Sequence, residues 1–225
     1  MDTLLSAADS TRILKTTKDI LNVDIFAAGT DTTSTNIEWA ISELVKHPRV
    51  MKKLQQEVTE VANGRSMVSE DDLDKMKYLK AVIKETLRFH IPLPLLVQRE
   101  SMQDVEIMGY NIAAGTRVVI NAWALGRDPS LWKESEEFRP ERFLNSSKDY
   151  KGFDYEFIPF GAGRRGCPGI QFAIAVNEIA IANLVYKYDL GLPQGKGGEE
   201  LDMSEVTGLT THRKFPLHLV ATPRF

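Results

Sequence analysis

The chain has 225 residues and a formal net charge of −3, and 43% of its residues are hydrophobic while 26% are charged. This balance allows a buried core and argues against binding to nucleic acid, because no excess of positive charge needs to be neutralised. Its single cysteine excludes an internal disulfide framework and a zinc site built from several cysteines, and leaves a buried thiol or one reactive thiolate.

Membrane and export signals are absent from the sequence pattern. No segment approaches the roughly 18 consecutive apolar residues of a membrane-spanning helix. The most apolar segment, residues 172–185, is interrupted by polar side chains. The first residues lack the basic and apolar regions of a signal peptide. We therefore expect one globular unit over residues 1–225, without a membrane anchor of its own.

Helical periodicity dominates the first part of the chain. Apolar residues recur at three- and four-residue spacing over residues 17–47, which predicts a long helix that Pro48 closes. In its middle, residues 27–34 combine a glycine with side chains that compete for backbone hydrogen bonds. We expect the helix to be distorted there.

The remaining elements indicate a mainly α fold with a small β component. In chain order we expect an amphipathic helix over 49–63, a short helix capped by Ser69, a helix over 79–90, a small sheet within about 95–122, a long ordered loop over 128–154, a cysteine loop at 157–169, a buried helix over 168–188, and hairpin strands toward the end.

The strongest functional signal is the segment from Phe160 to Gly169, which contains Cys167. Its glycines allow positive φ and a close approach of the backbone to a ligand, and Pro168 suits the first position of a helix. We therefore expect Cys167 at a helix N-terminus, where the helix dipole and free N–H groups favour the metal-binding thiolate. A lone cysteine is more often a small buried apolar side chain. The surrounding glycines and arginines favour a ligand here.

A dinucleotide-binding loop is the alternative interpretation, because the segment from Gly161 to Gly166 also fits G-x-G-x-x-G. That fold needs a strand before the loop, which Pro159 interrupts, and a further strand after the helix that ends in an acid. Asp189 is the candidate acid, but no additional strand–helix–strand unit follows it.

Three further segments indicate a function only when they are considered together. Glu85 and Arg88 are three residues apart on one helix face, and Arg142 could join them in a charge triad. The segment 28–33 places a carboxylate beside a hydroxyl and a glycine inside a long helix, which suits proton delivery to a small bound molecule. In isolation each of these segments is more typical of a structural feature: a surface ion pair for Glu85 and Arg88, a solvated loop around Arg142, and a polar helix start for residues 28–33.

In this order, the four segments together resemble the cytochrome P450 superfamily, in a variant similar to the plant family-71 type. Members of that family are considerably longer. The resemblance implies that this chain is the C-terminal portion of a P450 fold, starting just before the central distal helix and lacking the N-terminal anchor.

The resemblance also implies residue roles. Cys167 matches the thiolate that binds the iron of haem b, and Asp31 and Thr32 match an acid–alcohol pair that delivers protons to dioxygen. The other matched sets are the distal-helix positions Ala28 and Gly29, the buried triad Glu85, Arg88 and Arg142, the propionate-binding Arg99 and Arg165, and the loop residues Phe160, Gly161, Gly163, Gly166 and Gly169.

The implied activity is a monooxygenase reaction on a small lipophilic substrate. It uses O2 and electrons from NADPH that arrive through a separate flavoprotein reductase, at the cytosolic face of the endoplasmic reticulum membrane. Substrate is expected to contact the turn at 208–210 and the residues Phe26, Thr30, Leu93, Leu95, Leu96, Val97 and Leu209. A different hypothesis is a truncated, inactive protein that only binds haem or associates with another chain.

Overall fold

The computed structural model describes residues 17–225, with side chains from residue 25 onward. The α-helices are α2 (Thr17–Lys46), α3 (Pro48–Ala62), α4 (Lys77–Phe89), α5 (Ala122–Arg127) and α6 (Ile170–Lys187). Short 3-10 helices are η1 (Glu70–Lys75), η2 (Pro140–Phe143), η3 (Gly163–Arg165), η4 (Pro193–Gly195) and η5 (Gly198–Glu200). The first residues, for which no signal peptide was expected, lie outside the described part.

Within residues 17–225, eight short strands form four antiparallel pairs. They are β1 (Arg99–Glu100) with β4 (Arg117–Val118), β2 (Val105–Ile107) with β3 (Tyr110–Ile112), β5 (Tyr188–Gly191) with β8 (Val220–Pro223), and β6 (Glu205–Thr207) with β7 (Thr211–Arg213). The single sheet expected within 95–122 is therefore two separate pairs. Between the two pairs, the N–H of Ala114 donates to the Asp104 side chain at 2.8 Å and not to the backbone of a neighbouring strand. This bond interrupts the hydrogen-bond ladder.

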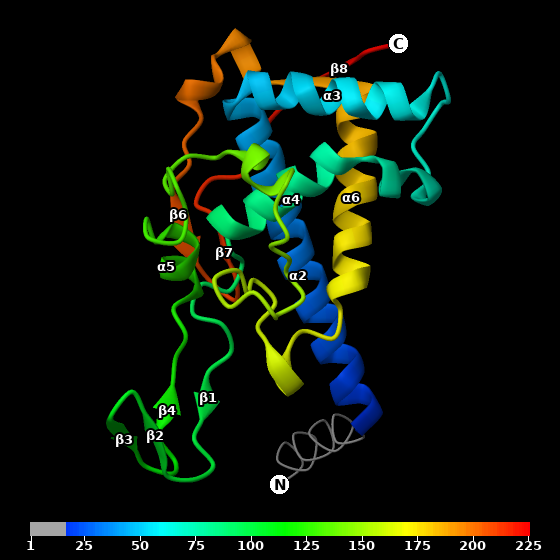
Figure 1. The fold of residues 1–225 in the computed structure, drawn as a ribbon. Coiled ribbons are helices and arrows are strands. Elements are labelled where there is room, and N and C mark those ends of the chain that lie inside the picture. Colours follow the sequence, from blue (N-terminus) through cyan, green and yellow to red (C-terminus); the bar gives the residue numbers. More distant parts are fainter. Residues whose placement is uncertain (1–16) are drawn as a thin grey trace, which may run out of the picture.

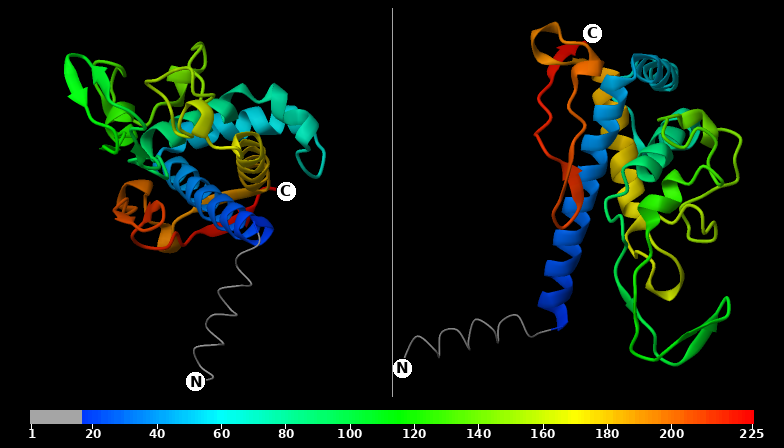
Figure 2. Two further views of the ribbon diagram at one scale, coloured as in Figure 1. Left: turned by 90° about the horizontal axis from the view of Figure 1, so that it is seen from below. Right: turned by 90° about the vertical axis from the view of Figure 1, so that its left-hand side faces the viewer.

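The four longer helices form the body of the molecule. The helix α2 packs along α6, α3 crosses near one end of both, and α4 contacts all three (Figure 1). The hairpin β6–β7 lies on one side of α2, while α4 and the loops that follow it lie on the other side (Figure 2). Helix α2 therefore contacts both α4 on one side and the β6–β7 hairpin on the other.

The expected distortion of α2 is absent, because the helix is continuous from Thr17 to Lys46. Two hydroxyl side chains of this segment bond to carbonyl oxygens of the preceding turn, and so do not displace the backbone ladder. Thr32 Oγ1 donates to the Ala28 carbonyl at 2.7 Å, and Ser34 Oγ donates to the Asp31 carbonyl at 3.0 Å.

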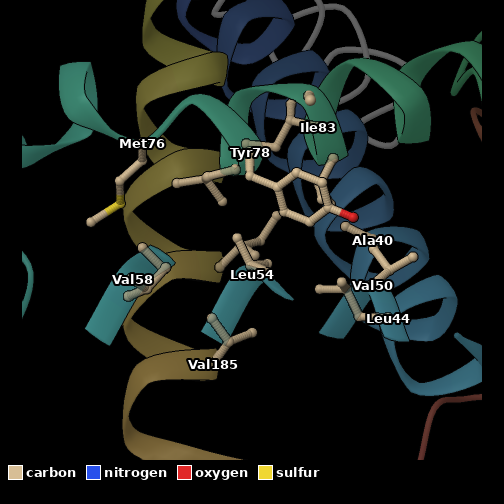
Figure 3. Close-up of a cluster of buried hydrophobic side chains, with 14 of the residues drawn as sticks. Ala40, Leu44, Val50, Leu54, Val58, Met76, Tyr78, Ile83 and Val185 are labelled. Carbon is tan, nitrogen blue, oxygen red and sulfur yellow. The ribbon is translucent and has the colours of Figure 1, made fainter. Parts of the chain in front are cut away.

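Apolar side chains from α2, α3, α4 and α6 meet in one core (Figure 3). Pro48 does not merely end α2; it occupies the start of α3, where its missing N–H costs no helical hydrogen bond. The buried residues of α3 follow a four-residue spacing that places them on one face. Leu44, Leu54 and Ile181, from three different helices, are fully buried in this core.

Helix α6 is less buried than its composition predicts. Ile181 and Val185 in its second half are fully buried, whereas Phe172 in its first turn is 74% exposed. The first turns of α6 extend beyond α3 and α4, which cover the rest of the helix (Figure 1). Within residues 17–225, no helix combines the length and the apolar character needed to cross a membrane.

Replacing Leu54 with alanine tests the position of the core. Leu54 is fully buried, so the cavity left by Leu54→Ala should lower the free energy of unfolding by ~2–5 kcal/mol. Leu184→Ala is the matched control, since this α6 leucine is 37% exposed. Denaturant unfolding should show a much smaller loss for the control. Equal losses for the two variants would contradict the packing described.

Candidate functional site

The cysteine loop is closed by its own backbone. Gly161 and Gly163 adopt φ values of +70° and +71°, which residues with a Cβ rarely adopt. The N–H of Cys167 then donates to the Phe160 carbonyl at 2.9 Å, and the N–H of Gly166 donates to Gly163 at 3.0 Å. These bonds fold the backbone into a tight turn and leave the Cys167 side chain exposed.

The helix after the loop begins later than expected. Its first i to i−4 hydrogen bond runs from Ala173 to Gly169 at 2.9 Å, so α6 starts at Ile170 and Pro168 is not its first residue. Cys167 lies just before the helix N-terminus, with Pro168 and Gly169 forming the connecting turn.

The dinucleotide-binding alternative is wrong. Residues 154–160 form no strand, and β5 after α6 pairs antiparallel with β8, whereas a dinucleotide fold requires parallel pairing.

Two arginines lie at the loop, Arg165 within it and Arg99 on β1 next to it. Arg99 on β1 donates from Nη2 to the Arg165 carbonyl at 3.1 Å, which ties the strand to the cysteine loop. A Cβ added at Gly161 would lie 3.9 Å from the same Arg99 atom, so the guanidinium also lies against the loop backbone. The structure thus brings together the two arginines that the sequence singled out. Arg165 itself is exposed.

The donor groups at this surface suit haem better than a bare metal ion. In the described part of the chain, no group of three or more histidine, cysteine or acidic side chains could hold a metal. Cys167 would therefore need a metal whose other ligands come with it, as the nitrogens of a porphyrin do. A Cβ added at Gly169 would lie 3.9 Å from Cys167 Sγ, so this glycine keeps a side chain away from the sulfur, and a Cβ at Gly163 in the same loop would meet nothing within 4 Å. The cationic side chains of Arg99 and Arg165 at this loop suit carboxylate groups on such a ligand.

The Glu85 carboxylate is fully buried and paired with two arginines. Arg88 donates from Nε to Glu85 Oε2 at 2.7 Å and from Nη2 to Oε1 at 2.8 Å. Arg142 donates from Nε to Oε1 at 3.0 Å, and the backbone N–H of Arg139 reaches the same oxygen at 2.7 Å. The three predicted residues therefore lie together in one network.

The two arginines also organise the backbone of the long loop. Arg88 donates to the carbonyls of Gly126, Ser135 and Glu137, and Arg142 donates to those of Lys133, Glu134 and Glu137. Gly126 was not predicted as a functional residue. A Cβ there would lie 2.5 Å from the Arg88 carbonyl oxygen, so only glycine fits. A glycine inside a short helical segment was the available signal.

The acid and alcohol predicted on α2 occupy adjacent positions with different partners. Asp31 Oδ2 accepts a hydrogen bond from Thr210 Oγ1 at 2.8 Å, whereas Thr32 donates to the backbone of its own helix. Ala28, Gly29 and Thr30 are exposed on α2, and a Cβ at Gly29 would meet nothing within 4 Å. This surface of α2 is open to a ligand.

The segments expected to contact substrate are joined by backbone bonds. The N–H of Thr211 donates to the Pro92 carbonyl at 2.8 Å, which places the β6–β7 hairpin beside residues 92–97. Most of the predicted contact residues are exposed, with exposed fractions of 76% for Phe26, 48% for Leu95, 67% for Val97 and 69% for Leu209; Thr30 is also exposed, and Leu93 and Leu96 are half-buried. Thr210 departs from the expectation, because its side chain is buried against α2.

A buried acid–histidine cluster was not anticipated. Glu43 Oε1 lies 2.6 Å from His90 Nε2, and Glu205 Oε1 lies 3.2 Å from His90 Nδ1. The His90 ring stacks on Trp39 at 4.0 Å. Burial opposes the charge of Glu43, but hydrogen bonds from His47 and His90 and their positive charge outweigh it and lower the pKa of Glu43 to about 2. The cluster joins α2 to α4 and β6.

Comparisons with known proteins agree on one family. The family model described as Cytochrome P450 matches residues 2–219. The chain is 57% identical over 221 residues to a 3-beta-hydroxylase from Tanacetum parthenium, covering 97% of this chain and 44% of that protein. It is 60% identical over 201 residues to cytochrome P450 71A6 from Nepeta racemosa, covering 89% of this chain and 39% of that protein. It is 58% identical over 200 residues to psoralen synthase from Ammi majus, covering 89% of this chain and 40% of that protein.

Solved structures give the same result for the fold. Two zebra fish cytochrome P450 structures, with progesterone and with abiraterone, superpose with TM-scores of 0.76 and 0.80 at 30% identity. The two superpositions cover 89% and 90% of this chain but only 44% and 46% of the matched chains. The mainly α fold class with small sheets is confirmed, and the chain spans less than half the length of these proteins.

The Glu43 cluster predicts a pH effect on stability. Because the folded pKa lies below the ordinary value of 4.5, the stabilisation from Glu43 is present above pH 4.5 and is lost as the pH falls toward 2. Unfolding measurements between pH 5 and 2 should therefore show a shallower loss of stability for Glu43→Gln than for the unaltered protein. Glu60→Gln on the exposed side of α3 is the control for removal of a carboxylate. An unchanged slope in Glu43→Gln would contradict the role of this cluster.

Proposed function

This chain belongs to the cytochrome P450 family, and on that premise we propose that the protein is a haem-thiolate monooxygenase. It inserts one oxygen atom from O2 into a small lipophilic substrate. The observation that carries the proposal is the exposed Cys167 in a loop closed by glycines at positive φ, with Arg99 and Arg165 beside it.

The proximal side of the site consists of the cysteine loop. Cys167 holds the iron as a thiolate, and Arg99 and Arg165 pair with the propionates of haem b. When bound, haem supplies the reductive activation of dioxygen, a chemistry that a cysteine thiolate ligand favours. The backbone bond from Cys167 to Phe160 keeps the sulfur at the surface of the loop.

The distal side consists of α2. Asp31 takes up a proton at its carboxylate, and Thr32 passes a proton on through its hydroxyl. The Thr32 hydroxyl donates to the Ala28 carbonyl in the structure, and its oxygen lone pairs remain available to accept a hydrogen bond. To pass a proton on, the hydroxyl rotates away from the Ala28 carbonyl and gives up its own proton as its oxygen takes up another. This arrangement suits a proton relay next to the open surface of Ala28 and Gly29.

The substrate contacts apolar side chains from three segments. Phe26 on α2, Leu95 and Val97 after α4, and Leu209 at the hairpin tip are exposed. A backbone bond from Thr211 to Pro92 holds residues 92–97 to the hairpin, and the Thr210–Asp31 hydrogen bond holds the hairpin to α2. An apolar surface of this kind favours a lipophilic molecule. Electrons come from NADPH through a flavoprotein reductase at the cytosolic face of the endoplasmic reticulum, a part of the proposal that rests on the family alone.

The absorption spectrum of the reduced, carbon monoxide-bound protein tests the ligand assignment. The purified protein that carries this chain should show a Soret band red-shifted by thiolate ligation, and Cys167→Ser should abolish that band. A thiolate spectrum without NADPH-dependent oxidation in the presence of reductase would favour an inactive haem-binding protein. Failure to bind any haem would overturn the proposal.

Thr32→Ala tests the proton relay. Loss of the hydroxyl should lower the product formed per NADPH consumed by about ten-fold or more, because proton delivery then fails while electrons still arrive. Ser34→Ala removes an exposed hydroxyl two residues away on the same helix and should leave this ratio unchanged. Unchanged coupling in Thr32→Ala would refute the role of Thr32.

A further inference from the structure

Two buried threonines connect to the Asp31 carboxylate. Thr210 Oγ1 lies 2.8 Å from Asp31 Oδ2 and 3.1 Å from Thr35 Oγ1. Thr210 and Thr35 are 1% and 4% exposed, so water does not compete for these hydroxyls. The contact joins α2 to the β6–β7 hairpin across 179 residues of sequence.

The chemistry of the groups fixes the direction of these hydrogen bonds. An ionised carboxylate only accepts hydrogen bonds, so the single hydroxyl proton of Thr210 must point to Asp31. The oxygen of Thr210 then accepts from Thr35, which places the two hydroxyls and the carboxylate in one directed chain. Such chains strengthen each member bond where water is excluded.

The backbone around Thr210 is itself held in place. The N–H of Thr211 donates to the Pro92 carbonyl at 2.8 Å, and Trp39 Nε1 donates to the Thr211 carbonyl at 3.2 Å. The Thr210 carbonyl accepts the N–H of Gly208 at 2.9 Å, which closes the hairpin tip. The Thr210 hydroxyl is therefore presented to Asp31 from a fixed support.

We propose that Thr210 is a positioning residue for the proton relay. By holding Asp31 Oδ2, it fixes the carboxylate orientation and leaves Oδ1 as the oxygen that exchanges protons. No described side chain bonds to Oδ1. Leu209, the neighbouring residue, is an exposed substrate-contact candidate, so the same anchor couples the wall of the substrate site to the acid. The inference rests on the proposed monooxygenase function.

The test uses the whole haem-loaded protein with reductase and measures the fraction of consumed NADPH that is recovered as hydrogen peroxide. This ratio needs no identified substrate. Thr210→Val keeps the side-chain shape but removes the hydroxyl, and should raise the peroxide fraction by about five-fold, the factor expected for the loss of one ordinary hydrogen bond. Thr210→Ser keeps the hydroxyl and should restore the value of the unaltered protein.

A double-mutant cycle separates positioning from general damage. If Thr210 acts through Asp31, then Thr210→Val should add nothing to the peroxide fraction of Asp31→Asn. The matched control is Thr211→Val, since the Thr211 hydroxyl is buried in the same hairpin without a hydrogen-bond partner among the described residues. This control should leave the peroxide fraction unchanged.

Thermal unfolding midpoints provide a readout independent of turnover, and here Asp31→Ala replaces Asp31→Asn because an asparagine amide oxygen could still accept the Thr210 hydrogen bond. The midpoint losses of Asp31→Ala and Thr210→Val should be less than additive, because each variant removes the same bond. Additive losses would overturn the inference, and so would a peroxide fraction in Thr210→Val equal to that of the unaltered protein. In either case, a thiolate spectrum of the unaltered protein would leave the proposed function intact. Absence of that spectrum in the unaltered protein would instead overturn both.

Discussion

The loops that lead to the cysteine depend on one interaction, a buried carboxylate paired with two arginines. Glu85 has no access to water, and a charge in that position is tolerated only with full pairing. Arg88 and Arg142 supply that pairing and use their remaining N–H groups on backbone carbonyls between residues 126 and 137. One ionic network therefore fixes the path of a loop that has little regular secondary structure.

Aromatic packing extends this order to the cysteine loop. Trp132, inside the part of the loop held by the arginines, and Phe143, after it, pack on Phe157 at 6.1 and 5.2 Å between ring centroids. Phe160 lies three residues further on, and its carbonyl accepts the N–H of Cys167. The position of the sulfur is thus linked through packed rings to the charge network. The opposite side of the site depends on α2, whose Asp31 and Glu43 are tied to the hairpin and to α4.

Local motifs made the site partly predictable. The glycines and the cysteine of the loop are consecutive, so their chemistry could be inferred from sequence, although the start of α6 could not. Glu85 and Arg88 share a helix face, but their burial depends on Arg142, 57 residues beyond Glu85. The contacts of Glu43 with His90 and of Asp31 with Thr210 follow no periodicity, since they join segments 47 and 179 residues apart. The distortion expected in α2 was wrong because isolated propensities do not register hydroxyls that bond back along the helix.

The central claim is that Cys167 binds the haem iron, and the iron K-edge X-ray absorption of the purified protein tests it most directly. The spectrum reports the atoms bonded to iron without assuming any substrate or reductase. We predict one sulfur neighbour in addition to the porphyrin nitrogens, and loss of that sulfur in Cys167→Ser. A coordination shell of nitrogen and oxygen alone in the unaltered protein, or a sulfur neighbour that persists in Cys167→Ser, would contradict the assignment.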